Sequence, residues 1–387
     1  MRNKAINLEY YTGVDLGQEN SGAKSHIIGI VEGLKKYGFN VTLISSSFIG
    51  NSNINEKHIL VRKKNYSLHN QLLEQLRLVK ILLFKKSPPD VVYVRFALTY
   101  IVPAIYAFLK KIPFFLEINA VAEKESSHPF LLKFAKMLEI FILKRSSGVF
   151  VVSKELKEYF VGRTILPNLI HVIPNACEMH LIEKAINNQF SRRSLMRDTF
   201  TIGWLGTFQK RQGIPILLRA VSLLKDDMPN IRLILAGEGA EKRFCKQLVE
   251  ELNIEKFVSF VGYVEPVYIF EFMNKCDVAV APYVGELSIE AKISPLKVFT
   301  YLGCGRISIV SNLSIFSLFK NCNAVKYFKD GDVEDLAEKI RQTSFLKMDE
   351  RLALENEALS FIASAHTWDH VAANTGKIIK SHLYVNK

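Results

Sequence analysis

The stretch "IGWLGTFQKRQGIPILLRAVSLL", residues 202–224, decides the fold. An apolar run typical of a buried strand ends at Gly206, and an apolar helix begins at Gly213 with a proline in its first turn. Lys210 and Arg211 lie in the loop that faces the helix start, where exposed N–H groups and the helix dipole favour an anion. The stretch therefore predicts a strand–loop–helix unit that binds a phosphate group.

The alternation of strand and helix continues in both directions. Short apolar runs bounded by proline, glycine or polar residues recur along the chain: "NVTLIS", "PDVVYVRF", "PFFLEIN", "SGVFVVS", "IRLILAGEG", "VSFVGYV", "DVAVAPY" and "RISIVSN". Such runs, separated by helical segments, are typical of parallel sheets. Because 387 residues are many for a single core, we expect two doubly wound α/β domains.

A polar stretch near the middle of the chain, residues 183–199, predicts a linker. It places a first domain at residues 1–185 and a second at 198–360. The segment from about 361 to 387, which contains Trp368, has the pattern of a terminal helix. We expect this helix to pack back on the first domain.

A second helix start lies in "SPLKVFTYLGCGR", residues 294–306. Ser294 and the proline after it precede a short helix that has Lys297 in its first turn and two glycines at its end. In open α/β sheets, ligands bind beyond the carboxyl ends of the strands. We expect the two helix starts and their cations to meet there on a diphosphate.

The net charge of +13 is distributed unevenly. Residues 1–197 contain 28 Lys and Arg against 15 Asp and Glu, whereas residues 198–387 contain 23 of each. A basic excess in one half indicates contact with a membrane surface, a nucleic acid or a phosphorylated substrate, and solvated surface lysines are the alternative. The sequence has no aromatic-basic platform, so we expect no nucleic-acid partner.

Two stretches of the first half combine apolar and basic residues: "QLLEQLRLVKILLFKK", residues 71–86, and "FLLKFAKMLEIFILKRS", residues 130–146. Each predicts an amphipathic helix with a lysine-rich polar face. The apolar faces either pack on the sheet or dock to anionic lipid, and the sequence leaves both alternatives open.

Cysteine usage and hydropathy bear on the compartment. Five cysteines are scattered and never form a C-x-x-C pair, which favours a reducing compartment and argues against a structural zinc. Residues 1–13 lack the apolar core of a signal peptide, and no stretch reaches the roughly 18 apolar residues of a spanning helix. The nine histidines show no metal-ligand spacing. We expect a cytoplasmic protein without a metal site, peripheral on the inner face of the membrane if the lipid alternative holds.

The order of these segments resembles that of the retaining GT-B glycosyltransferases of family four. Gly22 resembles the family's N-terminal glycine loop, and "VIPNACEMHLI", residues 172–182, resembles its strand ending in Pro-Asn-Gly, with Ala176 replacing the glycine. Residues 202–224 resemble the segment that holds the donor phosphates, and "SPLKVFTYLGCGRISIVSN" resembles the signature helix and strand. The match covers about residues 10–320, and it implies two Rossmann-like domains that face a cleft.

The resemblance also implies an activity. It implies transfer of a hexosyl group, with retention of anomeric configuration, from a nucleotide-sugar on the second domain to a glycan or lipid-linked acceptor on the first. Such a reaction belongs to polysaccharide biosynthesis and would need no metal ion or other cofactor, because the cations stabilise the leaving diphosphate. The implied donor contacts are Gly22, Gly206, Thr207, Tyr263, Ser294, Leu296, Lys297 and Thr300. The implied catalytic residues are Glu117, Lys210 and Arg211.

The acceptor side is expected in "PFFLEINAVAEKE". Glu117 and Asn119 follow a predicted strand, so the sheet rule also places them at the crevice. The resemblance adds Glu123, because related enzymes carry Glu-x-Asn and a later glutamate at this segment. The alternative is that Glu117 caps the next helix.

The sequence departs from the family at the donor site. Two glutamates eight positions apart are replaced by Lys292 and Thr300, the second being the ribose-holding position; Glu286 and Glu290 are close enough to substitute for the first. A threonine hydroxyl lacks the bidentate, charge-assisted contact of a carboxylate.

The arginine and lysine that bind phosphate in many members of the family fall on Thr207 and Gln212, which leaves Lys210 and Arg211 as displaced candidates. These departures keep a second hypothesis open, a non-catalytic GT-B-like binding subunit. A dinucleotide-dependent oxidoreductase is disfavoured because the sequence lacks G-x-G-x-x-G and its ribose-binding acid.

Overall fold

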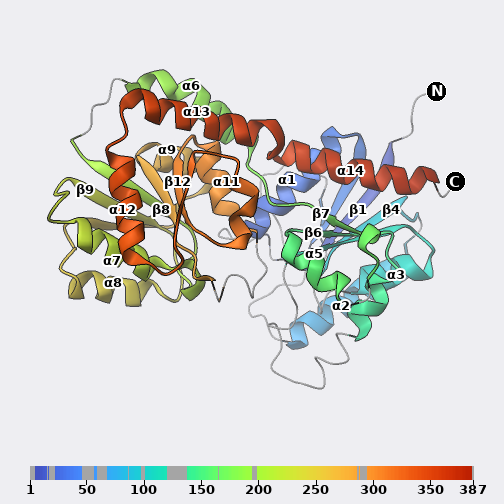
Figure 1. Ribbon diagram of the computed structural model, residues 1–387. Coiled ribbons are helices and arrows are strands. Elements are labelled where there is room, and N and C mark those ends of the chain that lie inside the picture. Colours follow the sequence, from blue (N-terminus) through green and yellow to red (C-terminus); the bar gives the residue numbers. More distant parts are fainter. Residues whose placement is uncertain are drawn as a thin grey trace. The chain divides into compact units, whose positions relative to one another are not determined.

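The computed structural model describes residues 5–14, 16, 22–45, 56–58, 68–85, 87–96, 101–119, 137–163, 165–193, 198–285, 287 and 294–385. The chain forms two compact units (Figure 1). Unit 1 comprises Met1–Pro174, Lys292–Ser294 and Trp368–Lys387, and unit 2 comprises Asn175–Ala291 and Pro295–Thr367.

Unit 1 is built on a sheet of seven parallel strands. Their order in the sheet is β3-β2-β1-β4-β5-β6-β7, and their bounds are β1 Ile6–Thr12, β2 Phe39–Ser45, β3 Glu56–His58, β4 Val91–Arg95, β5 Phe114–Ile118, β6 Gly148–Val151 and β7 Ile170–Val172. β1, β4, β5 and β6 are almost wholly buried because helices cover both faces. The direction of winding reverses between β1 and β4.

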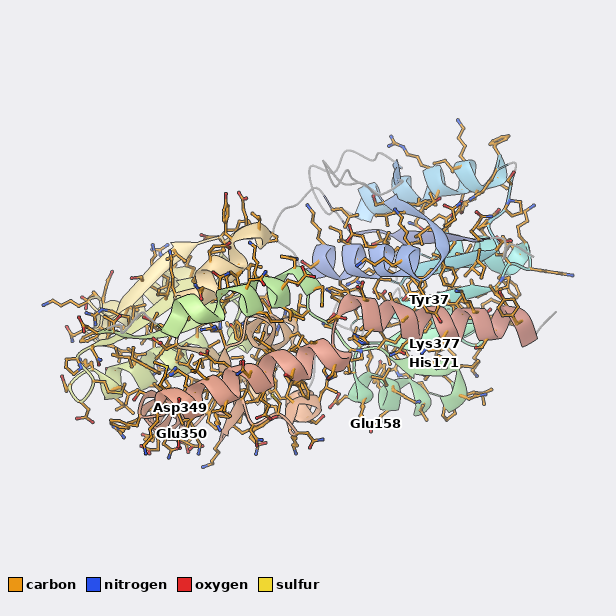
Figure 2. All side chains as sticks on the ribbon, turned by 90° about the horizontal axis from the view of Figure 1, so that it is seen from above. Tyr37, Glu158, His171, Asp349, Glu350 and Lys377 are labelled. Atoms are coloured by element: carbon orange, nitrogen blue, oxygen red, sulfur yellow. The ribbon has the colours of Figure 1, made fainter. Side chains whose placement is uncertain are left out.

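Helices α1 (Gly22–Lys36) and α14 (Trp368–Val385) cover one face of this sheet, and α2 (Leu68–Leu83), α3 (Val102–Leu109) and α5 (Lys154–Val161) cover the other (Figure 1). α14 packs against glycines of α1. A Cβ on Gly29 would lie 2.4 Å from the Trp368 ring, and a Cβ on Gly33 would lie 2.4 Å from that of Ala372. Figure 2 shows Tyr37, just beyond α1, beside α14. The terminal helix thus belongs to unit 1.

Unit 2 is built on six parallel strands in the order β10-β9-β8-β11-β12-β13. Their bounds are β8 Phe200–Leu205, β9 Ile231–Ala236, β10 Val258–Gly262, β11 Val278–Ala281, β12 Ile307–Ser311 and β13 Val325–Phe328. The winding reverses between β8 and β11, so this sheet has its switch point where those two strands end. The two doubly wound α/β folds predicted from the sequence are confirmed.

The core of unit 2 lies between the sheet and helices α7 (Ile214–Leu224), α8 (Lys242–Glu251) and α12 (Val333–Ser344). The remaining helices are α6 (Met179–Arg193), α9 (Ile269–Asn274), α11 (Leu296–Gly303) and α13 (Met348–Ala365). Asp349 and Glu350 in the first turn of α13 complement the helix dipole (Figure 2). In the part of the chain that the structure describes, no helix is long and apolar enough to cross a membrane.

The predicted linker over 183–199 is wrong in its first part. Most of it is helix, because Leu181, Ile182 and Ala185 line one side of α6 and are buried. The polar side chains on the opposite side gave the stretch the composition of a linker, and α6 belongs to unit 2.

Candidate functional site

The loop after β8 is held in place by its backbone. The N–H of Gly206 donates to Ala236 at 3.0 Å, and the N–H of Val284 donates to the carbonyl of Arg211 at 3.0 Å. Gly213 has φ +64°, and a Cβ there would lie 1.6 Å from the carbonyl oxygen of Pro282, so no other residue fits. These contacts fix the loop at the carboxyl ends of β8 and β11, which is the switch point of the sheet.

Lys297, in the first turn of α11, points its ammonium into this loop. The side chain is buried, and Nζ donates to Oε1 of Gln212 at 2.6 Å. The ring centroids of Trp204 and Tyr283 lie 4.2 and 5.1 Å from Nζ. A Cβ on Gly206 would lie 2.8 Å from Nζ, so the glycine leaves room for the ammonium. Within the described residues, no carboxylate pairs with Lys297.

This environment is electrostatically unsatisfied. Burial lowers the pKa of Lys297 well below its ordinary value, and the nearby Arg211 lowers it further. Two cations are thus close together with only neutral partners for the buried one. An anion bound between them would remove the repulsion and restore the charge of Lys297.

Two helix starts add donors at the same edge. α7 begins directly after Gly213 and α11 directly after Pro295, and neither of these N-cap residues has a side chain that could cap its helix. Pro215 has no N–H, and the N–H groups of Ile216 and Val298 donate to the carbonyls of Gly213 and Pro295 at 2.9 and 3.2 Å. The N–H groups that can favour an anion are therefore those of Ile214, Leu296 and Lys297. The arrangement can bind a phosphate or diphosphate.

The other predicted donor residues differ in their burial and in the unit to which they belong. Lys210 and Thr207 are exposed on the same loop, whereas Tyr263 and Leu296 are half-buried. Gly22 is the exposed first residue of α1, in unit 1. The predicted residues of the phosphate site that the structure brings together are Gly206, Arg211 and Lys297.

Four predicted residues concern the missing glutamates: Thr300, Lys292, Glu286 and Glu290. Thr300 is buried on α11, one turn beyond Lys297, and its hydroxyl donates to the carbonyl of Leu296 at 3.5 Å. Ser294 is half-buried and groups with unit 1. Glu286, Glu290 and Lys292 lie outside the described residues.

Sequence reasoning missed the residues that surround the Lys297 ammonium. At position 212 the sequence alone indicates only the loss of a cation, yet the Gln212 side chain accepts a hydrogen bond from Lys297 at 2.6 Å and lies near enough to the Tyr283 hydroxyl to lower its pKa. Burial raises the pKa of the Tyr283 hydroxyl to about 12. Nε1 of Trp204 is buried without a partner in the described structure. The position of Tyr283, two residues beyond β11 at the carboxyl edge, was a signal that could have found it.

Unit 1 carries a buried polar cluster around Glu117, at the end of β5. Five groups contact its carboxylate: Tyr10 and Tyr93 hydroxyls at 3.0 and 3.1 Å on Oε2, and Arg95, Asn119 and His26 at 2.6, 2.7 and 3.0 Å on Oε1. Burial alone would raise the pKa of Glu117, but His26 and Arg95 outweigh it and hold the pKa below its ordinary value. The carboxylate is therefore charged and holds its neighbours in place.

The cluster lies where β4 and β5 end, so the strands place the predicted pair Glu117 and Asn119 together. Tyr10, Tyr93 and Arg95 were missed. The predicted acceptor residue Glu123 lies outside the described residues, as does the helix that Glu117 was to cap in the alternative interpretation.

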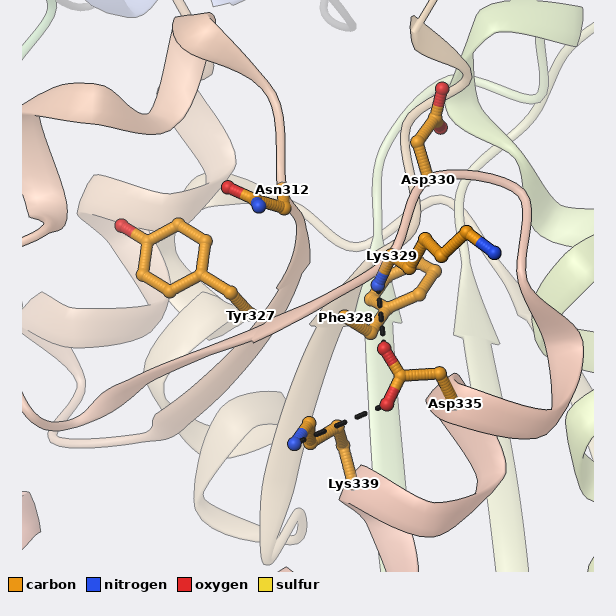
Figure 3. Close-up of a pocket in the computed structure, with 7 residues that line it drawn as sticks. All are labelled: Asn312, Tyr327, Phe328, Lys329, Asp330, Asp335 and Lys339. Carbon is orange, nitrogen blue, oxygen red and sulfur yellow. Dashed lines mark hydrogen bonds and ion pairs between the residues drawn. The ribbon is translucent and has the colours of Figure 1, made fainter.

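A separate cavity of about 420 Å³ opens at the ends of β12 and β13 (Figure 3). Asp335 accepts from the backbone N–H of Lys329 at 2.7 Å and lies 4.0 Å from Nζ of Lys339. Asp330 accepts from the N–H of Gly285 at 3.1 Å. Because its charged side chains already have partners, the cavity offers less to an anion than the Lys297 site.

Two family models match the chain. The model described as "Glycosyltransferase Family 4" matches residues 20–180, and the one described as "Glycosyl transferases group 1" matches residues 199–344. Together they cover most of both units.

Curated relatives are glycosyltransferases of several organisms. The uncharacterized glycosyltransferase MJ1059 of Methanocaldococcus jannaschii is 23% identical over 33% of this chain, and YqgM of Bacillus subtilis is 26% identical over 41%. These matches span only 30% and 41% of the relatives' own lengths. The capsular polysaccharide biosynthesis glycosyltransferase CapM of Staphylococcus aureus is 23% identical over 81% of this chain and 83% of its own.

Solved structures share the fold over the whole chain. A sucrose-phosphate synthase from Thermosynechococcus elongatus has a TM-score of 0.76 at 16% identity, covering 99% of this chain and 100% of its own. HepE from Anabaena, in complex with UDP and glucose, has a TM-score of 0.74 at 16% identity, covering 97% and 100%. With its two doubly wound units, its ordered motifs and both family models, the chain belongs to the GT-B-fold glycosyltransferases of group 1 and family 4.

Proposed function

We propose that the protein transfers a sugar from a nucleotide-sugar to an acceptor, with retention of configuration at the anomeric carbon, and that unit 2 binds the donor. The observation that carries this proposal is the buried ammonium of Lys297, which has a neutral amide and two aromatic rings as partners. A diphosphate is the ligand that such a cation, Arg211 and two uncapped helix starts suit best.

The same groups supply the electrostatic part of the reaction. Negative charge grows on the leaving diphosphate as the glycosidic bond to it breaks, and fixed donors stabilise that charge without having to reorganise. Lys297 and Arg211 would stabilise this charge directly, while Lys210 and Thr207 lie on the exposed side of the loop. We propose that these cations make turnover independent of added metal ions.

Unit 1 holds the acceptor in this proposal. Arg95 and Asn119 are oriented by the Glu117 carboxylate at 2.6 and 2.7 Å. Glu117 itself is 2% exposed, which supports a positioning role for it and leaves acceptor contact to its partners. The name of CapM, which concerns capsular polysaccharide biosynthesis, supports a glycan or lipid-linked precursor as the acceptor.

Calorimetric titration with nucleoside diphosphates and their sugars tests the donor site. UDP and UDP-glucose come first because HepE, of the same fold, has been solved with both. We expect binding in the presence of a chelator, and release of nucleoside diphosphate when an acceptor extract is added. Failure of every common nucleotide to bind would overturn the proposal.

Thr300 favours a second candidate, a binding subunit without transferase activity. Its hydroxyl already bonds to its own helix, and it replaces the carboxylate that would hold the ribose. This candidate predicts that a nucleotide-sugar binds but is neither transferred nor hydrolysed. Prolonged incubation of wild-type protein with UDP-glucose and acceptor, followed by assay of UDP, separates the two.

A further inference from the structure

In the part of helix α2 whose side chains the structure describes, residues 75–83, only a narrow stripe is buried. Leu78 and Leu82, one turn apart, pack into the core of unit 1. Other large apolar side chains of its second half and end stay exposed: Leu76, Val79, Ile81, Leu83 and Phe84. Leu83 and Phe84 are 73% and 77% exposed, where a surface helix ordinarily carries polar residues. Packing on the sheet therefore accounts for one side of this helix, and the exposed apolar side chains of the other side need a separate explanation.

The neighbouring segments continue the exposed apolar surface. α3 lies beside α2, with the N–H of Val102 donating to Oε1 of Gln75 at 3.2 Å. Residues 137–143 are helical and lie beside α3, where the rings of Phe108 and Phe141 meet edge to face at 6.0 Å. Four more large apolar side chains are exposed here: Phe108, Leu109, Met137 and Phe141.

Exposed basic residues are interspersed with these apolar ones. They are Arg77, Lys80, Lys110, Lys111, Lys144 and Arg145. The guanidinium of Arg145 lies 3.7 Å from the centre of the Phe141 ring. Of the side chains that the structure describes in these segments, at 75–85, 102–111 and 137–145, the one carboxylate is that of Glu139, which is 4% exposed; Glu74 of α2 lies just before the first of these ranges. We call the exposed residues of these three segments the apolar-basic face.

We infer that the apolar-basic face docks on an anionic lipid bilayer. Exposed apolar patches of this extent mark interaction sites. At a bilayer surface, aromatic and leucine side chains enter the boundary between headgroups and acyl chains, and lysine and arginine contact the lipid phosphates. A second copy of the chain fits less well, because it would bring two basic surfaces together.

This inference goes beyond the proposed function and does not depend on it. The face belongs to unit 1 and shares no residue with the Lys297 site in unit 2. Vesicle binding can therefore be measured without nucleotide, and nucleotide binding without vesicles.

The test is sedimentation of the full chain with phosphatidylcholine vesicles that contain or lack phosphatidylglycerol. The face variant is Phe108→Ser with Lys110→Gln and Lys144→Gln. The matched control is Arg243→Gln with Phe244→Ser and Lys246→Gln on α8, which removes the same charges and one exposed phenylalanine from unit 2. Circular dichroism spectra, compared with that of the wild type, test whether both variants are folded.

We expect the wild type and the control to bind only the anionic vesicles and to be released at high salt. The face variant should have an at least about tenfold lower partition coefficient, because each basic residue near the surface contributes about fivefold. Equal binding of both variants, or no wild-type binding, overturns the inference. If the wild type does not bind vesicles but forms a dimer in sedimentation equilibrium, and the face variant does not form this dimer, the face is a dimer interface and the inference is also overturned.

Discussion

Replacement of Lys297 by methionine should weaken nucleotide binding. Methionine fills a similar volume beside Trp204 and Tyr283 but removes the ammonium that donates to Gln212 at 2.6 Å. A hydrogen bond to a charged group contributes about 1.5–3 kcal/mol, so Kd for UDP should rise roughly 10- to 150-fold. Wild-type affinity should itself fall as the pH rises through the pKa of Lys297 in the free protein, because the diphosphate prefers the protonated amine.

The same replacement should affect stability in the opposite direction. Burial lowers the pKa of Lys297 in the folded protein below its value of about 10.4 in the unfolded chain. Between these two pKa values the unfolded chain binds more protons, so the free energy of unfolding rises with pH; below both, the full cost of burying the charge is present. Lys297→Met should therefore be more stable than the wild type near neutral pH and should lack this rise.

Titration calorimetry and urea unfolding, each at several pH values, measure the two effects. Lys210→Met is the matched control, because it removes the same charge from the exposed side of the same loop. Its effect on UDP binding should be small by comparison. Unchanged UDP affinity in Lys297→Met, an equal loss in Lys210→Met, or a less stable Lys297→Met would each refute the reasoning.

Glu117→Gln should lower the free energy of unfolding by about 3–5 kcal/mol in urea, because it leaves the buried cation of Arg95 uncompensated; a loss below about 1 kcal/mol would contradict that. Since the folded pKa of Glu117 is lowered, the wild type should also lose stability as the pH falls below about 4.3, and the variant should lose less. Thr300→Glu should tighten UDP binding by up to roughly 1–2 kcal/mol in calorimetry if its carboxylate reaches the ribose, and unchanged affinity would discard that role. Gly29→Ala should cost about 1–3 kcal/mol in thermal unfolding, because its Cβ would meet the Trp368 ring at 2.4 Å. If Gly29→Ala instead raised the stability, as alanine does in place of glycine at an exposed helix position, α14 would not pack against Gly29.

The parts of the candidate phosphate site that depend on local sequence were predictable. A glycine, two loop cations and a helix start lie within a few residues of one another, and anion binding at a helix start needs little else. The partner of Lys297 was not predictable in the same way, because Gln212 is 85 positions away. Trp204 and Tyr283 likewise both lie near the Lys297 ammonium because β8 and β11 are neighbours in the sheet.

Glu117 shows the same division. Its position at a strand end could be inferred from the sequence, and so could its proximity to Asn119. The number of hydrogen-bond partners around its carboxylate could not be inferred, because Tyr10 and Arg95 reach it only through the register of β1, β4 and β5. The boundary between the units was missed for a different reason, since a one-sided helix such as α6 has the overall composition of a loop.

The membership of α14 in unit 1 has a consequence for synthesis on the ribosome. Residues up to Pro174 emerge before unit 2, but the helix that covers Gly29 and Gly33 is translated only after unit 2. While unit 2 is being translated, the surface of α1 that carries these glycines is exposed, because α14 is not yet present to pack on it. Synthesis of unit 1 therefore starts before that of unit 2 and is completed after it, and a fragment ending at Pro174 would leave this apolar surface exposed to chaperones.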